Sequence, residues 1–263
     1  MRRYLRSAPH LGFLNLGRRA CYAAPDHVWS VGVADRYLLM ILTFGDVITA
    51  EERLRILGLL QDAKFVDGRT TAGSAAARVK HNEQLARDTP AYRDITEIVL
   101  GALRRSEAFR SAVQPKQMHS MIISRCSKGM SYGTHIDSAV MTAGEQLWRS
   151  DLSLTLFLND RSEYEGGELG IESGSGELQF KLKARAMLCY PTSWLHRVLP
   201  VTKGQRLVAV AWIHSLVRDA AAREILYDLD TTSRRLFEQY GKTREYDLVA
   251  KSHANLLRRW AEV

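Results

Sequence analysis

Two histidines and one aspartate stand out as side chains that could bind a metal ion together. His135 and Asp137 are separated by a single residue, and His196 follows 59 residues after Asp137. Two imidazole nitrogens and one carboxylate oxygen occupy one face of a metal ion and leave the opposite positions open, which is typical of non-haem iron(II) sites that react with O2. A closed zinc site would need a fourth ligand, and no Cys or His stands at a suitable spacing. The alternative is structural, with a polar turn at 135–137 and a structural histidine at 196.

Arg206 is a candidate for binding an anion near this metal. It follows His196 by ten residues and opens the otherwise apolar run RLVAVAWI at 206–213. If the run is a strand, Arg206 shares one face with the apolar residues at every second position. An inward-facing guanidinium needs an anionic partner, and it can hold a carboxylate by two parallel hydrogen bonds. The alternative is an arginine that faces solvent after a turn.

The segments that carry these residues predict a β-rich core. From about residue 118, apolar and polar residues alternate with period two in short runs separated by glycine-containing turns. Because most of these runs have no helical pattern between them, they favour an antiparallel sandwich or jelly roll. The predicted strands are Met118–Arg125, Asp151–Asn159, Gly167–Ile171, Glu177–Lys181, Ala186–Tyr190 and Arg206–Ser215.

Helix start signals flank this core on both sides. Thr49 and Glu52 form a capping box that predicts a helix over 49–63, and Thr89-Pro90 predicts a second helix start. Asp219 is placed to cap a C-terminal helix. The predicted fold class is therefore α+β, a mainly β core with flanking helices. We predict an N-terminal extension at 1–39, a helical support region at 40–116, a jelly-roll domain at 117–217 and a C-terminal helical region at 218–263.

Composition and charge narrow the classes of partner. Half of the net charge of +8 lies in residues 1–39, so the folded part lacks the concentrated basic surface of a nucleic-acid binder. No apolar run approaches the roughly 18 residues that span a bilayer, so no membrane partner is expected. The cysteines at 21, 126 and 189 form no C-x-x-C pair and suit a reducing cytoplasm.

Residues 1–39 differ in composition from the rest of the chain. They are rich in arginine and contain no acidic residue before Asp26. This composition fits either an organellar transit peptide or an extension upstream of a start at Met40. We favour the second interpretation, because the first helix start signal comes only after Met40.

Several short motifs resemble the bacterial PKHD-type hydroxylases, relatives of prolyl and lysyl hydroxylases among the iron- and 2-oxoglutarate-dependent oxygenases. The resemblance covers residues 40–263 and omits only the extension. It rests on fragments that occur in the same order: VDGR at 66–69, VKHN at 79–82, YGTHID at 132–137, FLND at 157–160, YEGGEL at 164–169, LHRV at 195–198 and GQR at 204–206.

The resemblance implies a fold, a ligand set and a reaction. The fold is a double-stranded β-helix in which His135, Asp137 and His196 bind Fe(2+), and Arg206 binds the C5 carboxylate of 2-oxoglutarate. The reaction uses O2 to hydroxylate a substrate C–H bond and releases succinate and CO2, with ascorbate as reductant. The substrate class stays open between a small molecule and a peptide.

Two further residues, Tyr132 and Cys126, lie near the predicted metal ligands in the sequence. Tyr132 is a candidate for orienting a ligand close to the metal, or alternatively a buried tyrosine that bonds to backbone. Cys126 departs from the family pattern, which usually has tyrosine there. In related enzymes a tyrosine near this point contacts 2-oxoglutarate, so one hydrogen bond to this cosubstrate is in question.

Three other functions fit parts of the pattern less well. A nucleic-acid demethylase on the same fold would need a basic groove. A cupin-type metal protein would prefer more histidine ligands and has no use for Arg206. A non-catalytic sensor of iron or 2-oxoglutarate would keep the ligands without turnover, and release of succinate separates this alternative from an enzyme.

Overall fold

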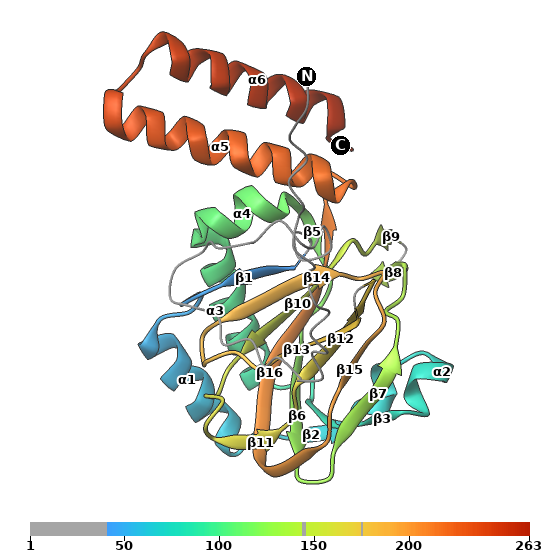
Figure 1. Cartoon of the computed structure of the whole chain (residues 1–263). Coiled ribbons are helices and arrows are strands. Elements are labelled where there is room, and N and C mark those ends of the chain that lie inside the picture. Colours follow the sequence, from blue (N-terminus) through green and yellow to red (C-terminus); the bar gives the residue numbers. More distant parts are fainter. Residues whose placement is uncertain (1–40, 144–145, 175) are drawn as a thin grey trace, which may run out of the picture.

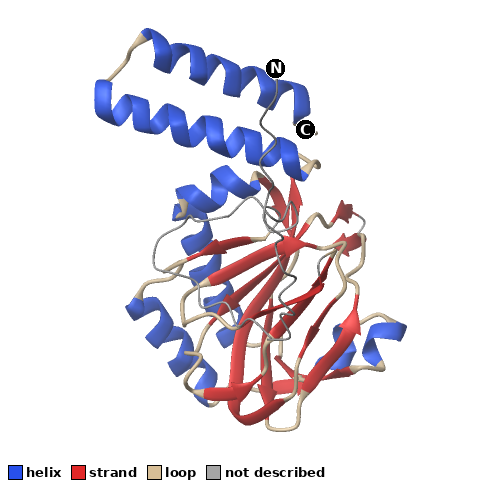
Figure 2. Cartoon of the chain, in the orientation of Figure 1, coloured by secondary structure: helices blue, strands red, loops and turns tan. Residues whose placement is uncertain are grey.

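Two antiparallel sheets face each other at the centre of the molecule, with helices around them (Figures 1 and 2). The computed structural model describes residues 41–143, 146–174 and 176–263. The two sheets form a double-stranded β-helix, so the predicted α+β class with a jelly-roll core is confirmed. The predicted extension at 1–39 lies outside the described residues, and the predicted domain boundaries stay predictions.

The larger sheet carries Arg206, the candidate for binding an anion. Its strand order is β1-β14-β10-β16-β6-β4-β2, and β5 and β11 also pair with β16. The long strand β16 is therefore flanked by several partners along its length. The bounds are β1 (Leu42–Phe44), β2 (Phe65–Asp67), β4 (Glu83–Leu85), β5 (Pro115–Met118), β6 (Ile122–Ser127), β10 (Leu152–Phe157), β11 (Tyr164–Gly166), β14 (Met187–Pro191) and β16 (Val201–Ser215).

The smaller sheet carries both histidines of the predicted metal site. Its strand order is β13-β12-β15-β7-β3, and a separate hairpin, β8-β9, follows β7. The bounds are β3 (Lys80–His81), β7 (Ser131–His135), β8 (Val140–Ala143), β9 (Gln146–Arg149), β12 (Leu169–Ser173), β13 (Gly176–Phe180) and β15 (His196–Val198). Since β3 belongs to this sheet and β4 to the larger one, the chain crosses between the sheets at Asn82.

Three helices before the jelly roll cover the outer face of the larger sheet. They are α1 (Ala50–Gln61), α3 (Pro90–Arg105) and α4 (Glu107–Val113), and their apolar faces meet the outward side chains of β10 and β14 in one core cluster. The capping box of Thr49 and Glu52 and the cap of Thr89 before Pro90 are present as predicted. A short 3-10 helix (Gly68–Thr71) and α2 (Ser74–Ala77) lie beside β3.

A second apolar cluster lies between the two sheets. It joins inward side chains of β10, β14 and β16 to those of β12. Phe157, Leu188 and Val208 come from the larger sheet, and Leu169 and Ile171 come from the smaller one. This layer sets the spacing between the strands that carry the predicted ligands.

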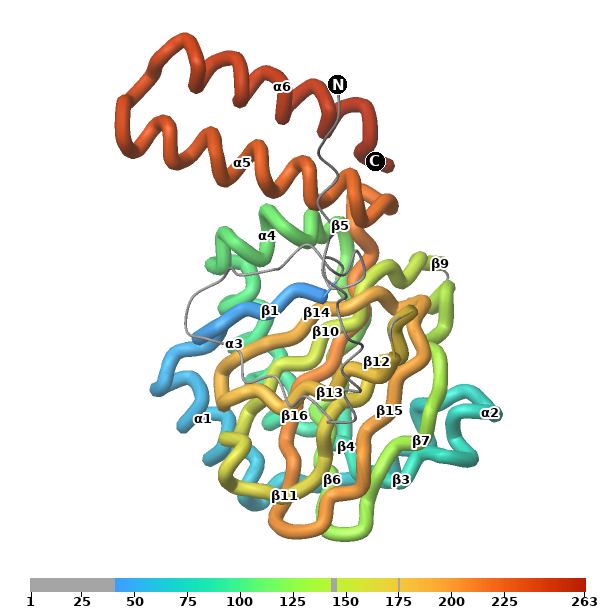
Figure 3. Tube along the Cα trace, in the orientation of Figure 1, coloured from blue at the N-terminus to red at the C-terminus, as the bar shows by residue number. Residues whose placement is uncertain are grey.

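The C-terminal region forms a helical hairpin that extends beyond the jelly roll (Figures 1 and 3). It consists of α5 (Ala220–Tyr240), which Asp219 caps as predicted, and α6 (Arg244–Trp260). A small apolar cluster around Val217 and Leu226 joins the two helices near the start of α5. Arg149 of β9 ties the end of the chain to the sheet rim, because it pairs with both Asp151 and Glu262 at 2.6 Å.

Two predicted strands are wrong in their extent. The strand predicted at Arg206–Ser215 begins earlier, because β16 starts at Val201. Met118–Arg125 is not continuous, because β5 ends at Met118 and β6 begins at Ile122. Between them Met121 is buried in the outer core, and its carbonyl accepts a hydrogen bond from the hydroxyl of Tyr92 at 2.7 Å. Burial of an apolar side chain on the helix-covered face therefore interrupts the alternation.

The outer core predicts a stability difference between two leucines. Leu154 is 0% exposed beneath the helices, whereas Leu147 of β9 is 72% exposed. Leu154→Ala should lower the free energy of unfolding by about 2–5 kcal/mol, since it removes buried methyl groups and leaves a cavity. Leu147→Ala should change it by no more than about 0.5 kcal/mol. Urea denaturation of both variants measures the difference, and equal losses would contradict the assigned core.

Candidate metal centre

Strand pairing places the two predicted histidine ligands opposite each other. His135 ends β7, His196 begins β15, and the two residues are direct partners in the antiparallel register. Their side chains therefore leave the smaller sheet on the same face, and their ring centroids are 4.2 Å apart. Asp137 follows β7 by two residues and joins them, so the structure brings all three predicted ligands together.

The three side chains enclose a space of the size of a metal ion. The separations from Asp137 are 3.8 Å to Nε2 of His135 and 3.5 Å to Nε2 of His196. One ligand atom from each residue lies within 4.8 Å of the other two. The side chains are 5–10% exposed. Of the part of the chain that the structure describes, these residues form the one cluster with such metal-ligand geometry.

Backbone carbonyls orient both imidazoles for metal binding. Nδ1 of His135 bonds to the carbonyl of Gly133 at 2.8 Å, and Nδ1 of His196 bonds to that of Trp194 at 3.0 Å. Because a carbonyl only accepts, Nδ1 carries the proton and Nε2 keeps its lone pair for the metal. Burial and the neighbouring His196 lower the pKa of His135 to about 4, which keeps this ring neutral.

Ser153 positions the carboxylate and was missed by the sequence analysis. Its hydroxyl donates to Oδ2 of Asp137 at 2.7 Å and lies 3.3 Å from the hydroxyl of Thr192. Ser153 is 0% exposed on β10, in the sheet that faces the histidines. The available signal was its polarity: Ser153 and Thr155 interrupt the apolar run of β10 at alternate positions, which indicates a polar requirement on the inner face.

Tyr132 packs against a predicted ligand. Its ring stacks on the imidazole of His135, with centroids 3.6 Å apart and planes 18° from parallel. The ammonium of Lys80 lies 5.0 Å above the Tyr132 ring and donates to the hydroxyl of Thr71 at 3.3 Å. Burial lowers the pKa of Lys80 to about 8. Tyr132 and Lys80 thus form one wall beside the histidines.

Arg206 points into the space between the sheets from β16. It is 3% exposed, and its Nε has no hydrogen-bond partner within the part of the chain that the structure describes. Its guanidinium carbon lies 5.5 Å from the ring centroid of Phe157. Among the residues at 41–143, 146–174 and 176–263, no carboxylate pairs with it. A buried guanidinium without such a partner is suited to an anionic ligand.

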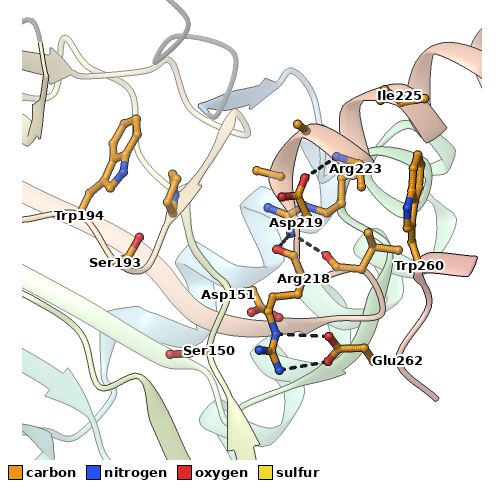
Figure 4. A pocket seen from close by; sticks show the side chains of 15 residues that line it. Ser150, Asp151, Ser193, Trp194, Arg218, Asp219, Arg223, Ile225, Trp260 and Glu262 are labelled. Atoms are coloured by element: carbon orange, nitrogen blue, oxygen red, sulfur yellow. Dashed lines mark hydrogen bonds and ion pairs between the residues drawn. The ribbon is translucent and has the colours of Figure 1, made fainter.

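A separate cleft lies next to the loops that carry the metal ligands (Figure 4). Its volume is ≈ 850 Å³, which is in the range of small-molecule sites. One wall comes from the jelly-roll rim, with Ser193 and Trp194 just before His196. The other wall comes from the start of α5 and from Trp260 and Glu262. The cleft therefore opens beside the metal centre rather than around it.

The donor set fits iron(II). Two neutral imidazole nitrogens and one carboxylate, held on one side by hydrogen bonds to Gly133, Trp194 and Ser153, leave the opposite side for further ligands. Arg206 supplies a buried cation in the same interior, which an anionic cosubstrate requires.

Comparisons with known proteins identify the family. Residues 121–214 match the 2OG-Fe(II) oxygenase superfamily, and residues 220–262 match the PKHD-type hydroxylase C-terminal domain. A PKHD-type hydroxylase of Synechococcus sp. (strain JA-2-3B'a(2-13)) is 51% identical over 224 residues, which cover 85% of this chain and 100% of the relative. The chain belongs to the PKHD-type hydroxylase family. A PKHD-type hydroxylase of Thermosynechococcus vestitus is also 51% identical, with the same coverage.

Solved structures of a prolyl-4-hydroxylase and of an alpha-ketoglutarate-dependent epimerase are similar to this chain over about two thirds of its length. A prolyl-4-hydroxylase of Pseudomonas putida covers 67% of this chain and 92% of its own, with a TM-score of 0.46 and 14% identity. The epimerase SnoN from nogalamycin biosynthesis covers 68% of this chain and 79% of its own, with a TM-score of 0.49 and 16% identity.

Family membership establishes the class of reaction. As a PKHD-type hydroxylase, the chain is an iron(II)- and 2-oxoglutarate-dependent dioxygenase, and its cofactors are Fe(2+) and 2-oxoglutarate. The hydroxylase C-terminal domain matches the hairpin of α5 and α6. None of the helices in the described ranges is both long and apolar enough to cross a bilayer.

The ligand assignment predicts graded losses of iron binding. His135→Ala, Asp137→Ala and His196→Ala should each abolish tight Fe(II) binding, because two donors remain. Ser153→Ala should weaken it only about 10–100-fold, the usual effect of losing a residue that orients a ligand. His253→Ala on α6 is the matched histidine control and should bind normally. Anaerobic equilibrium titration with Fe(II) measures all five variants, and full binding in any of the first three would refute the assignment.

Proposed function

We propose that this chain hydroxylates a C–H bond of a small molecule or peptide, with iron(II) on His135, Asp137 and His196 and 2-oxoglutarate anchored by Arg206. The observation that carries the proposal is the pairing of two features in one interior. A compact His-Asp-His cluster and a buried guanidinium without a carboxylate partner in the described ranges both face the layer between the sheets. A metal protein of another kind has no need for the second feature.

Each of these side chains has a separate task in the reaction. Iron(II), 2-oxoglutarate and O2 together supply the oxidising chemistry, with succinate and CO2 as co-products. The carbonyls of Gly133 and Trp194 hold the imidazoles so that Nε2 faces the metal. Ser153 fixes the Asp137 carboxylate by donating a hydrogen bond from its hydroxyl to Oδ2. The buried position of Arg206 excludes water from the ion pair with the distal carboxylate, which strengthens the pair.

Three further expectations belong to this proposal. Ascorbate acts as the reductant that keeps the iron in the ferrous state. The enzyme works in the cytoplasm, which is supported by Cys126 and Cys189 being free thiols. Nucleic acid is not the substrate, because only half of the net charge of +8 lies outside residues 1–39. Family membership and the complete ligand set favour this enzyme over a non-catalytic sensor.

Arg206 provides the test of the cosubstrate. Arg206→Ala should raise the 2-oxoglutarate concentration needed for half-saturation by about 30- to several-thousand-fold, because loss of one partner of a buried charge pair costs roughly 2–5 kcal/mol. Arg206→Lys should raise it less, since the charge remains while the paired hydrogen bonds are lost. Both variants should still bind Fe(II).

Titration of 2-oxoglutarate into the anaerobic Fe(II) form, followed by the metal-to-ligand charge-transfer band, measures these effects. Arg105→Ala is the matched control, because this arginine is 57% exposed and pairs with Glu52 on the surface. An unchanged titration in Arg206→Ala would overturn the cosubstrate assignment even if the iron site were confirmed.

The cleft supports a substrate that extends beyond its reacting carbon. Ser193 and Trp194 on one wall lead directly into His196, and Ser150 on the same wall donates to the carbonyl of Ser138, the residue after Asp137. Trp260 provides apolar surface on the opposite wall (Figure 4). A substrate whose reacting carbon is at the metal can therefore place its remaining part between the rim and the C-terminal hairpin.

Blocking the cleft should separate substrate binding from the iron chemistry. In a screen of peptides and metabolites for a mass gain of one oxygen, Ser193→Trp should lower the yield of oxygenated product. Slow succinate release without substrate should stay unchanged, because the metal and Arg206 are intact. Ser252→Trp on the exposed side of α6 is the control. Equal product yields from both variants would show that the substrate does not enter the cleft.

A further inference from the structure

The surroundings of Arg206 contain a second, unused hydrogen-bond donor. Position 126, where the family pattern has tyrosine, is directly opposite Arg206 in the pairing of β6 with β16. Here it holds Cys126, which is 2% exposed. Burial raises the pKa of this thiol, so it stays protonated and is at best a weak donor. The β6 side of Arg206 therefore offers no hydroxyl.

Tyr164 approaches Arg206 from the other side of β16. It begins β11 and is opposite Gly204 in the register, two residues before Arg206, so both side chains lie on the inner face of the sheet. Residues in this diagonal relation are within reach of a long aromatic side chain. β6 and β11 thus flank β16 with one candidate donor each.

Gly167 marks the place where Tyr164 and Arg206 meet. A Cβ atom at this position would lie 3.1 Å from both Cε2 of Tyr164 and Cδ of Arg206. The backbone of Gly167 also has φ +68°, a conformation that favours glycine. The edge of the Tyr164 ring and the side chain of Arg206 therefore both lie against the backbone of Gly167.

The hydroxyl of Tyr164 is buried, and among the described residues no acceptor for its proton is present. The residue is 3% exposed, and burial raises its pKa to about 12, although the charge of Arg206 and a hydrogen bond from it oppose this shift. The phenol therefore keeps its proton and can donate a hydrogen bond. A buried hydroxyl whose proton has no acceptor is unfavourable, and such groups indicate a missing ligand or a functional role.

Lys181 holds the Tyr164 ring in place. Its ammonium lies 4.1 Å above the ring centroid and donates to the backbone carbonyl of Tyr164 at 2.8 Å. The same ammonium lies 3.9 Å from the carboxylate of Glu168, so it is itself anchored. A ring fixed at its face and at its backbone presents its hydroxyl in one direction.

We propose that Tyr164 donates its phenolic hydrogen bond to the distal carboxylate of 2-oxoglutarate, beside the paired hydrogen bonds from Arg206. This assigns to β11 the role that the resemblance gives to a tyrosine on β6, and it rests on the proposed function of Arg206. A carboxylate has lone pairs beyond the two that a guanidinium fork occupies, so both donors can bind it at once.

The experiment compares Tyr164→Phe with Tyr92→Phe in the full chain. Tyr164→Phe should raise the dissociation constant of 2-oxoglutarate about tenfold or more in the anaerobic Fe(II) protein, as expected for a lost hydrogen bond to a charged group. Its Fe(II) affinity should not change. Tyr92→Phe should leave the 2-oxoglutarate titration unchanged, because the Tyr92 hydroxyl bonds to the backbone of Met121.

Thermal unfolding without ligands distinguishes a binding role from a structural one. Tyr92→Phe should lower the melting temperature, since it removes a made hydrogen bond. Tyr164→Phe should leave the melting temperature unchanged or raise it, since it removes a hydroxyl whose proton has no acceptor among the described residues. A lower melting temperature of Tyr164→Phe with unchanged cosubstrate affinity would overturn the proposal.

Cys126→Ala tests the competing donor on β6. This variant should bind 2-oxoglutarate as the unchanged protein does, and weaker binding by Cys126→Ala together with unchanged binding by Tyr164→Phe would assign the role to the thiol instead. Arg206→Ala distinguishes a failure of the Tyr164 assignment from a failure of the proposed function. If it weakens 2-oxoglutarate binding while Tyr164→Phe does not, the Tyr164 assignment fails alone. If neither variant weakens binding, the proposed function fails with it.

Discussion

The register between β7 and β15 is the constraint on which the site depends. His135 and His196 are far apart in the chain, and only their pairing as direct partners turns both imidazoles to the same face. A slip of one residue in either strand would move one ring to the opposite face of the sheet. Asp137 is in turn held by Ser153 from the facing sheet. The ligand geometry therefore depends on the pairing within one sheet and on the spacing between the two.

The spacing between the two sheets is set by an interior that is apolar except at the residues of the candidate site. Phe157, Leu188 and Val208 pack against Leu169 and Ile171 in the layer between the sheets. Placing a guanidinium in the same layer is costly unless an anion compensates it. A bound dicarboxylate would supply that compensation, so cosubstrate binding would also stabilise the fold. In the proposed assignment, function and stability would thus be linked through one buried positive charge.

Local signals in the sequence predicted much of the frame, whereas contacts between distant segments were harder to predict. The caps at Thr49, Thr89 and Asp219 depend on neighbouring residues alone, and the structure has each of them. The break between β5 and β6 was missed because it depends on where Met121 becomes buried. Ser153 was missed because its role appears only when a second sheet brings Asp137 to it.

Position 126 holds cysteine where the family pattern has tyrosine, and this difference indicates what the proposed cosubstrate pocket requires. A ligand carboxylate next to Arg206 needs a donor at a point in space, not at a fixed place in the chain. Strand β6 lies directly opposite Arg206 on one side of β16, and β11 begins opposite Gly204 on the other side, two residues before Arg206, so either neighbour can supply that donor. Cys126 removes the hydroxyl on the β6 side, and Tyr164 keeps one on the β11 side. Because Gly167 leaves room for both the phenol and the arginine, the cysteine at 126 is compatible with an intact cosubstrate site.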